Sequence, residues 1–163
     1  MDRVAPLARP MGAPMAHVPS QDAPGSLLQQ LYTLFEAARG AAEREVLRSH
    51  NLDMRAWLVL RSIGKFESAT QRQIAAATAL DKVAVNRAAS WLKELGLALS
   101  LPNTRDGRSH LLELSFAGEQ TLACCAREIA ALESDLLDGL SEIECRELVQ
   151  RLKHLQRSLA YRF

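Results

Sequence analysis

The sequence of 163 residues has no long apolar run, few cysteines and few aromatic residues. A transmembrane helix needs about 20 predominantly apolar residues, so we expect no membrane-spanning segment and no membrane partner. The three cysteines, Cys124, Cys125 and Cys145, are odd in number and two are adjacent. This is not typical of a disulfide framework and favours a reducing compartment, which we take to be the bacterial cytoplasm.

The chain also lacks the motifs of common catalytic and metal sites. It has no glycine-rich phosphate loop, no nucleophile motif and no placed carboxylate pair. The histidines, His17, His50, His110 and His154, are scattered, and none has a cysteine or carboxylate at metal-ligand spacing. The sequence therefore predicts a protein that is not an enzyme and that has no cofactor and no metal site.

Proline is nearly confined to the N-terminus, since five of the six prolines lie in residues 1–24. Arg3 and Arg9 are present there, but no apolar segment follows, so the pattern is not that of a signal peptide. We expect residues 1–25 to form a flexible leader and residues 26–163 to form the folded domain.

Charge is distributed unevenly although the net charge is only +1. Residues 50–110 contain nine Lys or Arg and five Asp or Glu, which gives +4, whereas residues 111–163 contain six and nine, which gives −3. A basic segment beside an acidic one favours a surface that binds a polyanion.

Apolar residues recur at helical spacing over most of the folded domain. The spacing predicts one helix from about Ser26 to Ser49, a second after Leu52, and two final helices before and after the capping box Ser141–Glu144. Around residues 97–101 and 112–114 the period falls to two, which predicts a β-hairpin. The expected fold class is mainly α with a small β-hairpin.

Residues 70–96 have the pattern of a helix-turn-helix. Thr70 and Gln73 form a capping box that predicts a helix over about 71–77. Asp81 is a suitable N-cap for a second helix, and Gly96 suits the left-handed position that ends it. Leu80 is the apolar residue of the turn, and Ala79 stands where many such motifs have glycine.

The second helix of this motif is predicted to have two different faces. We expect Val85, Ala88, Leu92 and Leu95 to face the core. The opposite face has no acidic residue and carries side chains that suit DNA bases and phosphates. With the two residues that begin the first helix, the candidate DNA-binding set is Thr70, Gln71, Lys82, Val83, Ala84, Asn86, Arg87, Ser90 and Lys93.

The predicted hairpin follows the second helix directly, as a wing does in a winged helix. Its tip carries Arg105 and Arg108 within four residues, with Pro102 and Gly107 expected to hold the turn. An arginine at such a tip can enter a narrow minor groove, and Asp106 can orient Arg108 through a charge-assisted hydrogen bond. These residues complete the candidate DNA-binding set.

From Leu27 to Leu159 the sequence resembles the MarR family of winged helix-turn-helix transcriptional regulators. The resemblance is carried by the wing sequence Asp106-Gly107-Arg108 and by the sequence Leu114-Ser115-Phe116-Ala117-Gly118 after it. Two departures are the sequence Val83-Ala84-Val85-Asn86, where many members have small hydroxyl residues, and Trp91, where arginine is common.

The resemblance implies a homodimer that binds a near-palindromic operator in double-stranded DNA as a repressor. Residues 26–49 and 116–163 would form dimerisation helices and residues 50–115 the DNA-binding lobe. A small effector, such as an aromatic acid, would bind in a crevice near Trp57 and Leu60. The candidate dimer contacts are apolar residues of the outer helices: Leu27, Leu31, Leu34, Leu136, Leu148, Leu152, Leu155 and Leu159.

Two other functions are compatible with the sequence. The chain can be a redox-responsive repressor that uses Cys124, Cys125 or Cys145. It can also be an adaptor, in which the winged helix binds a protein rather than DNA. Full retention of function after Arg87→Ala and Arg108→Ala would favour the adaptor, and a change of operator affinity on thiol oxidation would favour the redox-responsive repressor.

Overall fold

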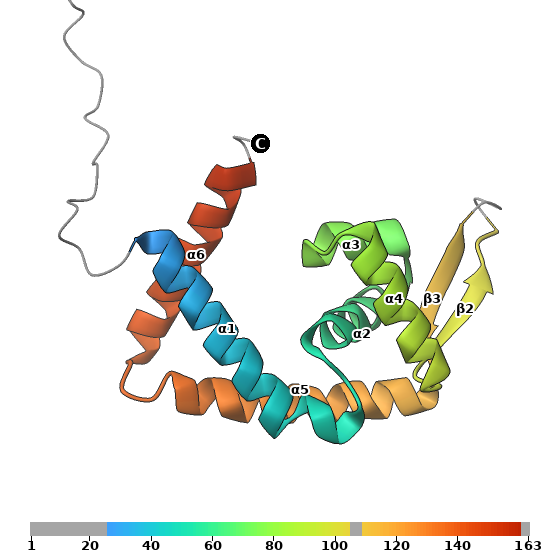
Figure 1. The fold of residues 1–163 in the computed structure, drawn as a ribbon, viewed down its shortest axis with the longest axis horizontal. Helices are drawn as coiled ribbons and strands as arrows, with labels where there is room; N and C mark the ends of the chain where they lie inside the picture. The colour runs from blue at the N-terminus through green and yellow to red at the C-terminus, as the bar shows by residue number, and fades with distance from the viewer. Residues whose placement is uncertain (1–25, 105–108, 161–163) are drawn as a thin grey trace, which may run out of the picture. The chain divides into compact units, whose positions relative to one another are not determined.

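The computed structural model describes residues 26–104 and 109–160 (Figure 1). The chain divides into two compact units, residues 1–35 and 36–163. The elements, in chain order, are α1 (Leu27–Glu45), the 3-10 helix η1 (Leu47–His50), α2 (Met54–Phe66), β1 (Ser68–Thr70), α3 (Gln71–Thr78), α4 (Lys82–Glu94), β2 (Ala98–Pro102), β3 (His110–Leu114), α5 (Phe116–Leu136) and α6 (Glu142–Ala160). This order confirms the predicted fold class, a mainly helical chain with a small sheet. Among the described helices, none is long and apolar enough to cross a bilayer.

The sheet has one strand more than the predicted hairpin. β2 and β3 pair antiparallel as expected, with Ser100 opposite Leu112. β1 pairs with the other edge of β3, so the strand order is β1-β3-β2. β1 immediately precedes α3, and the helix-turn-helix is therefore attached to the wing through hydrogen bonds of the sheet.

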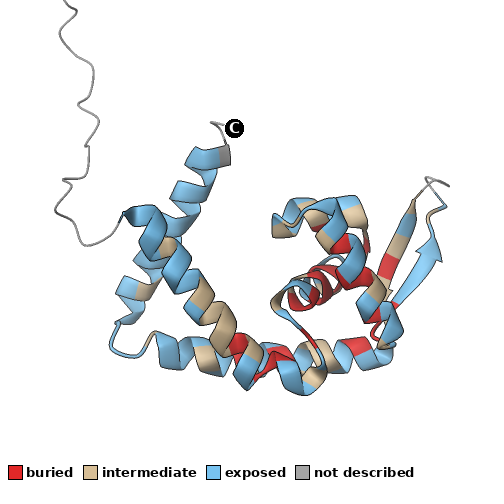
Figure 2. Cartoon of the chain, viewed as in Figure 1, coloured by how far each residue is buried: buried red, intermediate tan, exposed pale blue. Residues whose placement is uncertain are grey.

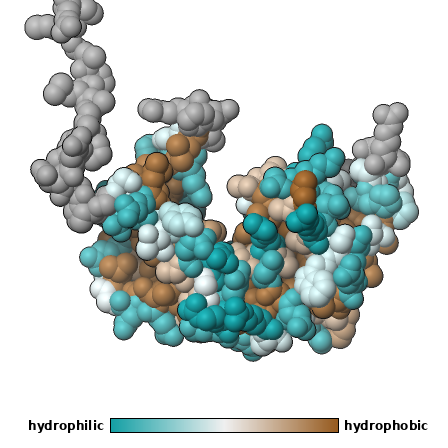
Figure 3. Space-filling view, in the orientation of Figure 1, coloured by the Kyte–Doolittle hydropathy of each residue, from teal (hydrophilic) through white to brown (hydrophobic). Residues whose placement is uncertain are grey.

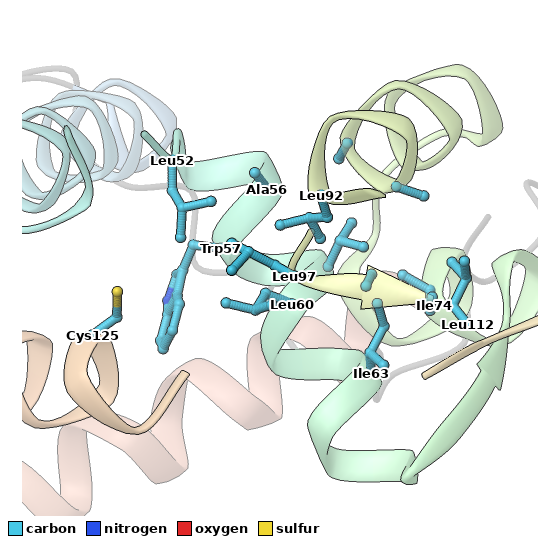
Figure 4. Close-up of a cluster of buried hydrophobic side chains, with 14 of the residues drawn as sticks. Leu52, Ala56, Trp57, Leu60, Ile63, Ile74, Leu92, Leu97, Leu112 and Cys125 are labelled. Carbon is cyan, nitrogen blue, oxygen red and sulfur yellow. The ribbon is translucent and has the colours of Figure 1, made fainter. Parts of the chain in front are cut away.

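The core of the second unit is organised around α2, which packs against α3, α4, α5 and the sheet. Leu60 and Ile63 of α2 are fully buried, in one cluster with Ile74 of α3 and Leu92 of α4 (Figure 4). Burial of each such side chain contributes about 1.5–3 kcal/mol. Figure 2 shows the buried residues gathered in this region, whereas α6 is almost entirely exposed.

Capping side chains begin the helices where the sequence predicts. Thr70 and Gln73 make both hydrogen bonds of the predicted capping box, from Thr70 N to Gln73 Oε1 at 2.9 Å and from Gln73 N to Thr70 Oγ1 at 3.3 Å. The box at α6 is also present, and hydrogen bonds from Ser141 lower the pKa of the Glu144 carboxyl. The predicted first helix is shorter than expected, because α1 ends at Glu45 and residues 47–50 form a 3-10 turn.

Gly118, the glycine of the motif after the wing, permits a close contact between α5 and the strand region. A Cβ at this position would lie 2.0 Å from the carbonyl oxygen of Leu97, which is a backbone atom that cannot move aside. The preceding Ser115 caps α5 and donates its hydroxyl to the Gly96 carbonyl at 2.6 Å. These contacts fix the start of α5 against the end of α4.

The leucines of β2 lie on the solvent side of the sheet. The sequence alternates Leu97, Leu99 and Leu101 with smaller residues, yet Leu99 and Leu101 are 50% and 38% exposed. Ala98 is buried instead, at 3% exposed. Ala98 is the one buried residue of β2, and it lies in the same core cluster as Leu92 of α4 and Leu112 of β3.

Ala79 in the turn between α3 and α4 has a left-handed backbone with φ +57°. For a residue with a Cβ, this left-handed conformation is about 1–2 kcal/mol less favourable than a right-handed one. Glycine avoids this penalty in the folded state. Its greater freedom in the unfolded chain reduces the gain in stability by about 0.4–1 kcal/mol. We expect Ala79→Gly to raise the free energy of unfolding by about 0.5–1 kcal/mol, measured by urea denaturation. The control Ala76→Gly, at an exposed position inside α3, should lower it by about 1 kcal/mol. Changes of the same sign in both variants would contradict this account of the turn.

Candidate nucleic-acid interface

The helix α4 buries one face and exposes the other. Val85, Ala88 and Leu92 are 1%, 6% and 0% exposed, as predicted, and Leu95 packs partly buried against the same cluster. The opposite side exposes Lys82, Val83, Asn86, Arg87 and Lys93, with Ala84 and Ser90 at intermediate burial. The packing therefore fixes which side chains of α4 are available to a partner.

Asp81 is an acidic residue at the start of α4, as its N-cap. Its Oδ1 accepts a hydrogen bond from the amide of Ala84 at 2.7 Å, which confirms the predicted N-cap. The amide groups in the first turn of a helix have no carbonyl acceptor within the helix, and the Asp81 carboxylate accepts the hydrogen bond of one of them. The carboxylate also lies at the positive end of the helix dipole. Asp81 thus has a structural role although its charge is unfavourable beside a polyanion.

A polar contact between the two helices orients Asn86. The Nε2 of Gln71, at the start of α3, donates to Oδ1 of Asn86 at 3.2 Å. An asparagine that recognises adenine must present its amide in one fixed plane. In the structure, Gln71 therefore holds the Asn86 amide by a hydrogen bond between α3 and α4, and Thr70 is the N-cap of α3.

An open hollow of about 1140 Å³ lies between α3, α4 and the wing strands. Its cationic lining residues are Arg72, Lys82 and Lys93, and no acidic residue is present among the described residues that line it. Arg72 was not among the predicted DNA-binding residues. An exposed cation within the first turn of the first helix of the motif is the signal that could have identified it.

The base of the wing is closed by residues on both sides of its tip. Asn103 Nδ2 donates to Ser109 Oγ at 2.8 Å, and the Asn103 amide donates to the Ser109 carbonyl at 3.3 Å. The predicted tip residues Arg105, Asp106 and Arg108 lie outside the described residues.

Trp91 connects α4 to the segment that precedes α2. Its indole Nε1 donates to the carbonyl oxygen of Asn51 at 2.8 Å, and its ring is 43% exposed. Asn51 itself has a left-handed backbone with φ +57° and caps η1. From the sequence, Trp91 is only a departure from the arginine that is common at this position in the family that the chain resembles. In the structure, its indole joins α4 to the segment between η1 and α2.

The predicted crevice residues Trp57 and Leu60 are both in the core, at 4% and 0% exposed. Trp57 lies beside Cys125 of α5 (Figure 4). Burial of the Cys125 thiol, followed by the effects of Cys124 and Glu128, raises its pKa to about 11. Cys125 is therefore a buried apolar residue, and a redox function would have to use Cys124 or Cys145, which are partly exposed free thiols.

Comparisons with known proteins agree with this arrangement. The model of the MarR family matches residues 50–109, which cover α2, the helix-turn-helix and the first wing strand, β2, and end before β3. A comparison with curated proteins finds no match. Among solved structures, a probable transcriptional regulator from Pseudomonas aeruginosa is 26% identical, with a TM-score of 0.71 over 80% of this chain and 96% of that chain.

Two further solved structures concern DNA binding directly. A mutant MarR from E. coli complexed with operator DNA is 23% identical, with a TM-score of 0.67 over 80% of this chain and 99% of that chain. BpsR from Bordetella bronchiseptica is 18% identical, with a TM-score of 0.75 over 80% of this chain and 93% of that chain. The DNA binding of BpsR is regulated by 6-hydroxynicotinic acid. At these identities the likeness establishes the fold.

The fold is that of a winged helix-turn-helix protein, and α4 is the helix whose exposed face is available to a partner. Over residues 50–109 the chain matches the model of the MarR family of transcriptional regulators, and the rest of its fold is similar to solved structures of MarR regulators. Regulators of this family are not enzymes.

Asp81 allows the helix cap and the surface charge to be tested separately. We expect Asp81→Ala to lower the free energy of unfolding by about 1 kcal/mol because the cap is lost. Asp81→Asn keeps a capping oxygen and removes the charge, so it should lower stability by less and raise affinity for duplex DNA roughly twofold. Urea denaturation and fluorescence anisotropy measure the two effects. Equal loss of stability in both variants would show that the charge, not the cap, is what α4 requires.

Proposed function

We propose that the chain is a homodimeric, sequence-specific repressor that a small ligand releases from DNA. The observation that carries the proposal is the division of α4 into a buried apolar face and an exposed face with three cations and one asparagine. The buried face fixes the helix, and the exposed face has the groups that read base edges in a major groove. The matched family and the operator complex of the E. coli MarR mutant support DNA as the partner.

Each exposed side chain of α4 has a proposed role. Arg87 would pair bidentately with guanine and Asn86, oriented by Gln71, with adenine. Val83 and Ala84 would contact thymine methyl groups, and the Ser90 hydroxyl can bond to either kind of base edge. The 61% exposure of Val83 is consistent with a contact made only in the complex.

Phosphate contacts would come from the ends of α4 and from the hollow beside it. Lys82, Lys93 and Arg72 line that hollow, and cations there would hold the DNA backbone in register without reading sequence. The proposed minor-groove contact of Arg105 and Arg108, with Asp106 as orienting partner, rests on their positions in the sequence.

Exposed apolar residues on the outer helices support a dimer. In α5 and α6, Leu136, Leu148, Leu152, Leu155 and Leu159 are between 38% and 59% exposed, and brown side chains are visible over α6 in Figure 3. In the first unit Leu27 and Leu34 are 59% and 64% exposed, and Leu31 is partly buried. Exposed apolar stripes of this extent are typical of interfaces. A twofold dimer would present two α4 helices to half-sites about one DNA turn apart.

A small aromatic acid is the proposed effector. The support is the regulation of BpsR by 6-hydroxynicotinic acid, together with Trp57 and Leu60 as candidate apolar contacts. Because both side chains are buried, the ligand would select a conformation in which the region around α2 is more open. The protein would act in the bacterial cytoplasm, where its operator is located.

Base and phosphate contacts can be separated by two substitutions in α4. We expect Arg87→Ala to weaken operator binding by about 1–3 kcal/mol and to weaken non-operator binding much less. Lys93→Ala should weaken both, and it should reduce the slope of log affinity against log salt by about 1. Anisotropy titrations over a salt series measure both quantities, with Arg127→Ala on α5 as an exposed control. Undiminished preference for the operator in Arg87→Ala would show that this residue does not read bases.

The dimer can be tested with a matched pair of substitutions in α6. Leu152→Glu should shift the chain from dimer to monomer in analytical ultracentrifugation, because a charge would be buried in an apolar interface. Gln150→Glu adds the same charge on the opposite side of the helix, 200° away at 100° per residue, and should leave the dimer intact. A monomeric wild-type chain, or equal dissociation of both variants, would contradict the proposed interface.

A further inference from the structure

Three side chains with metal-binding atoms meet at the junction of η1 and α5. His50 is the last residue of η1, and Cys124 and Glu128 are one turn apart on α5. Their ligand atoms all lie within 4.8 Å of one another. Cys124 Sγ is 3.2 Å from Glu128 Oε1, and His50 Nε2 is 3.7 Å from Glu128 Oε2. The three residues are far apart in the sequence, so the spacing of ligands along the chain does not indicate that they meet.

We propose that His50, Cys124 and Glu128 bind a divalent transition-metal ion of the zinc type. Zn²⁺ accepts imidazole, thiolate and carboxylate ligands at about 2.0–2.3 Å, so two ligands of a tetrahedral ion lie about 3.5 Å apart. The separations of 3.2 and 3.7 Å in the cluster agree with this value. The soft thiolate disfavours Mg²⁺ and Ca²⁺. Three protein ligands leave one position for water, and the Cys124 thiol would release its proton to solvent on binding.

The backbone holds the three ligands in place. Cys125, next to Cys124, is fully buried in the core beside Trp57, so this turn of α5 is anchored (Figure 4). Leu47, at the start of η1, is also fully buried, and Asn51 caps η1 in a left-handed conformation. The side chains of His50 and Glu128 remain 23% and 43% exposed, which leaves a path for an ion. Ligands fixed by rigid elements lose little freedom on binding.

The cluster is connected to the recognition face through one residue. Asn51 follows His50, and its carbonyl accepts the hydrogen bond from Trp91 of α4 at 2.8 Å. Arg87 is one helical turn before Trp91, on the exposed side of α4. An ion that fixes His50 therefore restrains the neighbouring Asn51. Zn²⁺ should thus stabilise the arrangement in which Trp91 of α4 is hydrogen-bonded to the Asn51 carbonyl. This coupling, unlike the metal site itself, rests on the proposed function.

Metal binding is tested on the full chain after chelator treatment under reducing conditions. Zn²⁺ affinity is measured by calorimetry, and Co²⁺ serves as a spectroscopic probe because a cysteine ligand produces a thiolate-to-metal charge-transfer band. We expect one ion per chain, and at least about tenfold weaker binding in His50→Ala, Cys124→Ser and Glu128→Gln. The matched controls Cys145→Ser, His154→Ala and Glu133→Gln change the same residue types elsewhere and should bind as wild type does.

Folding is followed in the same variants. Zn²⁺ should raise the melting temperature of the wild type and of the controls, and it should not raise that of the three ligand variants. Failure of the wild type to bind Zn²⁺ or Co²⁺ at millimolar concentration would overturn the site. So would an unchanged charge-transfer band in Cys124→Ser, or loss of the band in Cys145→Ser.

The coupling to DNA is tested by operator binding with and without Zn²⁺. We expect Zn²⁺ to raise the affinity of the wild type about fivefold or more, and Trp91→Phe to remove this effect while it retains metal binding. Equal affinity with and without Zn²⁺ would overturn the coupling and leave the site standing. Metal binding by a chain that binds no DNA would refute the proposed function alone, and DNA binding without metal binding would refute the site alone.

Discussion

The packing of α4 against α2 is the constraint on which the rest of the molecule depends. Val85 and Leu92 enter a core formed by Leu60 and Ile63, and all four side chains are at most 1% exposed. Because successive residues of a helix are separated by 100°, burial of these positions determines which residues face outward. The identity and direction of the exposed face, with Arg87 and Asn86, follow from the packing of the apolar face. The sheet adds a second restraint, because β1 joins α3 to the wing.

The same packing explains how a chain with a net charge of +1 can bind a polyanion. Cations of α3 and α4 meet around one hollow, and acidic residues are concentrated in the last third of the chain. Asp81 and Glu94 are acidic residues at the two ends of α4, and the hydrogen bond of Asp81 to the Ala84 amide accounts for its presence. Affinity for DNA then depends on where the charges lie rather than on their sum.

Local features of the fold could be predicted from the sequence, whereas long-range contacts could not. The capping box at Thr70 and the caps at Asp81 and Gly96 depend on neighbours within a few residues, and each is found in the structure. β1 is only three residues long and has no pattern of its own, so it was missed. Alternation in β2 was recognised, but nothing local indicates that Ala98 faces inward and Leu99 outward.

The candidate site shows the same division. The outward face of α4 follows from helical periodicity, and its exposed residues agree with the prediction. The contact of Trp91 with Asn51 joins residues 40 positions apart, and the cluster of His50 with Cys124 and Glu128 spans a still longer separation. Such contacts depend on how whole elements pack, which a single sequence does not specify. Arg72 was within reach of the sequence, since it is an exposed cation in the first turn of α3.

The central claim is that two copies of the exposed α4 face read DNA together. The most direct test is to select, from a random library of DNA duplexes, the sequences that the full chain binds. The account predicts enrichment of an inverted repeat whose half-sites are about one helical turn apart, with binding that weakens steeply as salt increases. Selection that enriches no sequence, or that enriches a single half-site without its inverted partner, would contradict it.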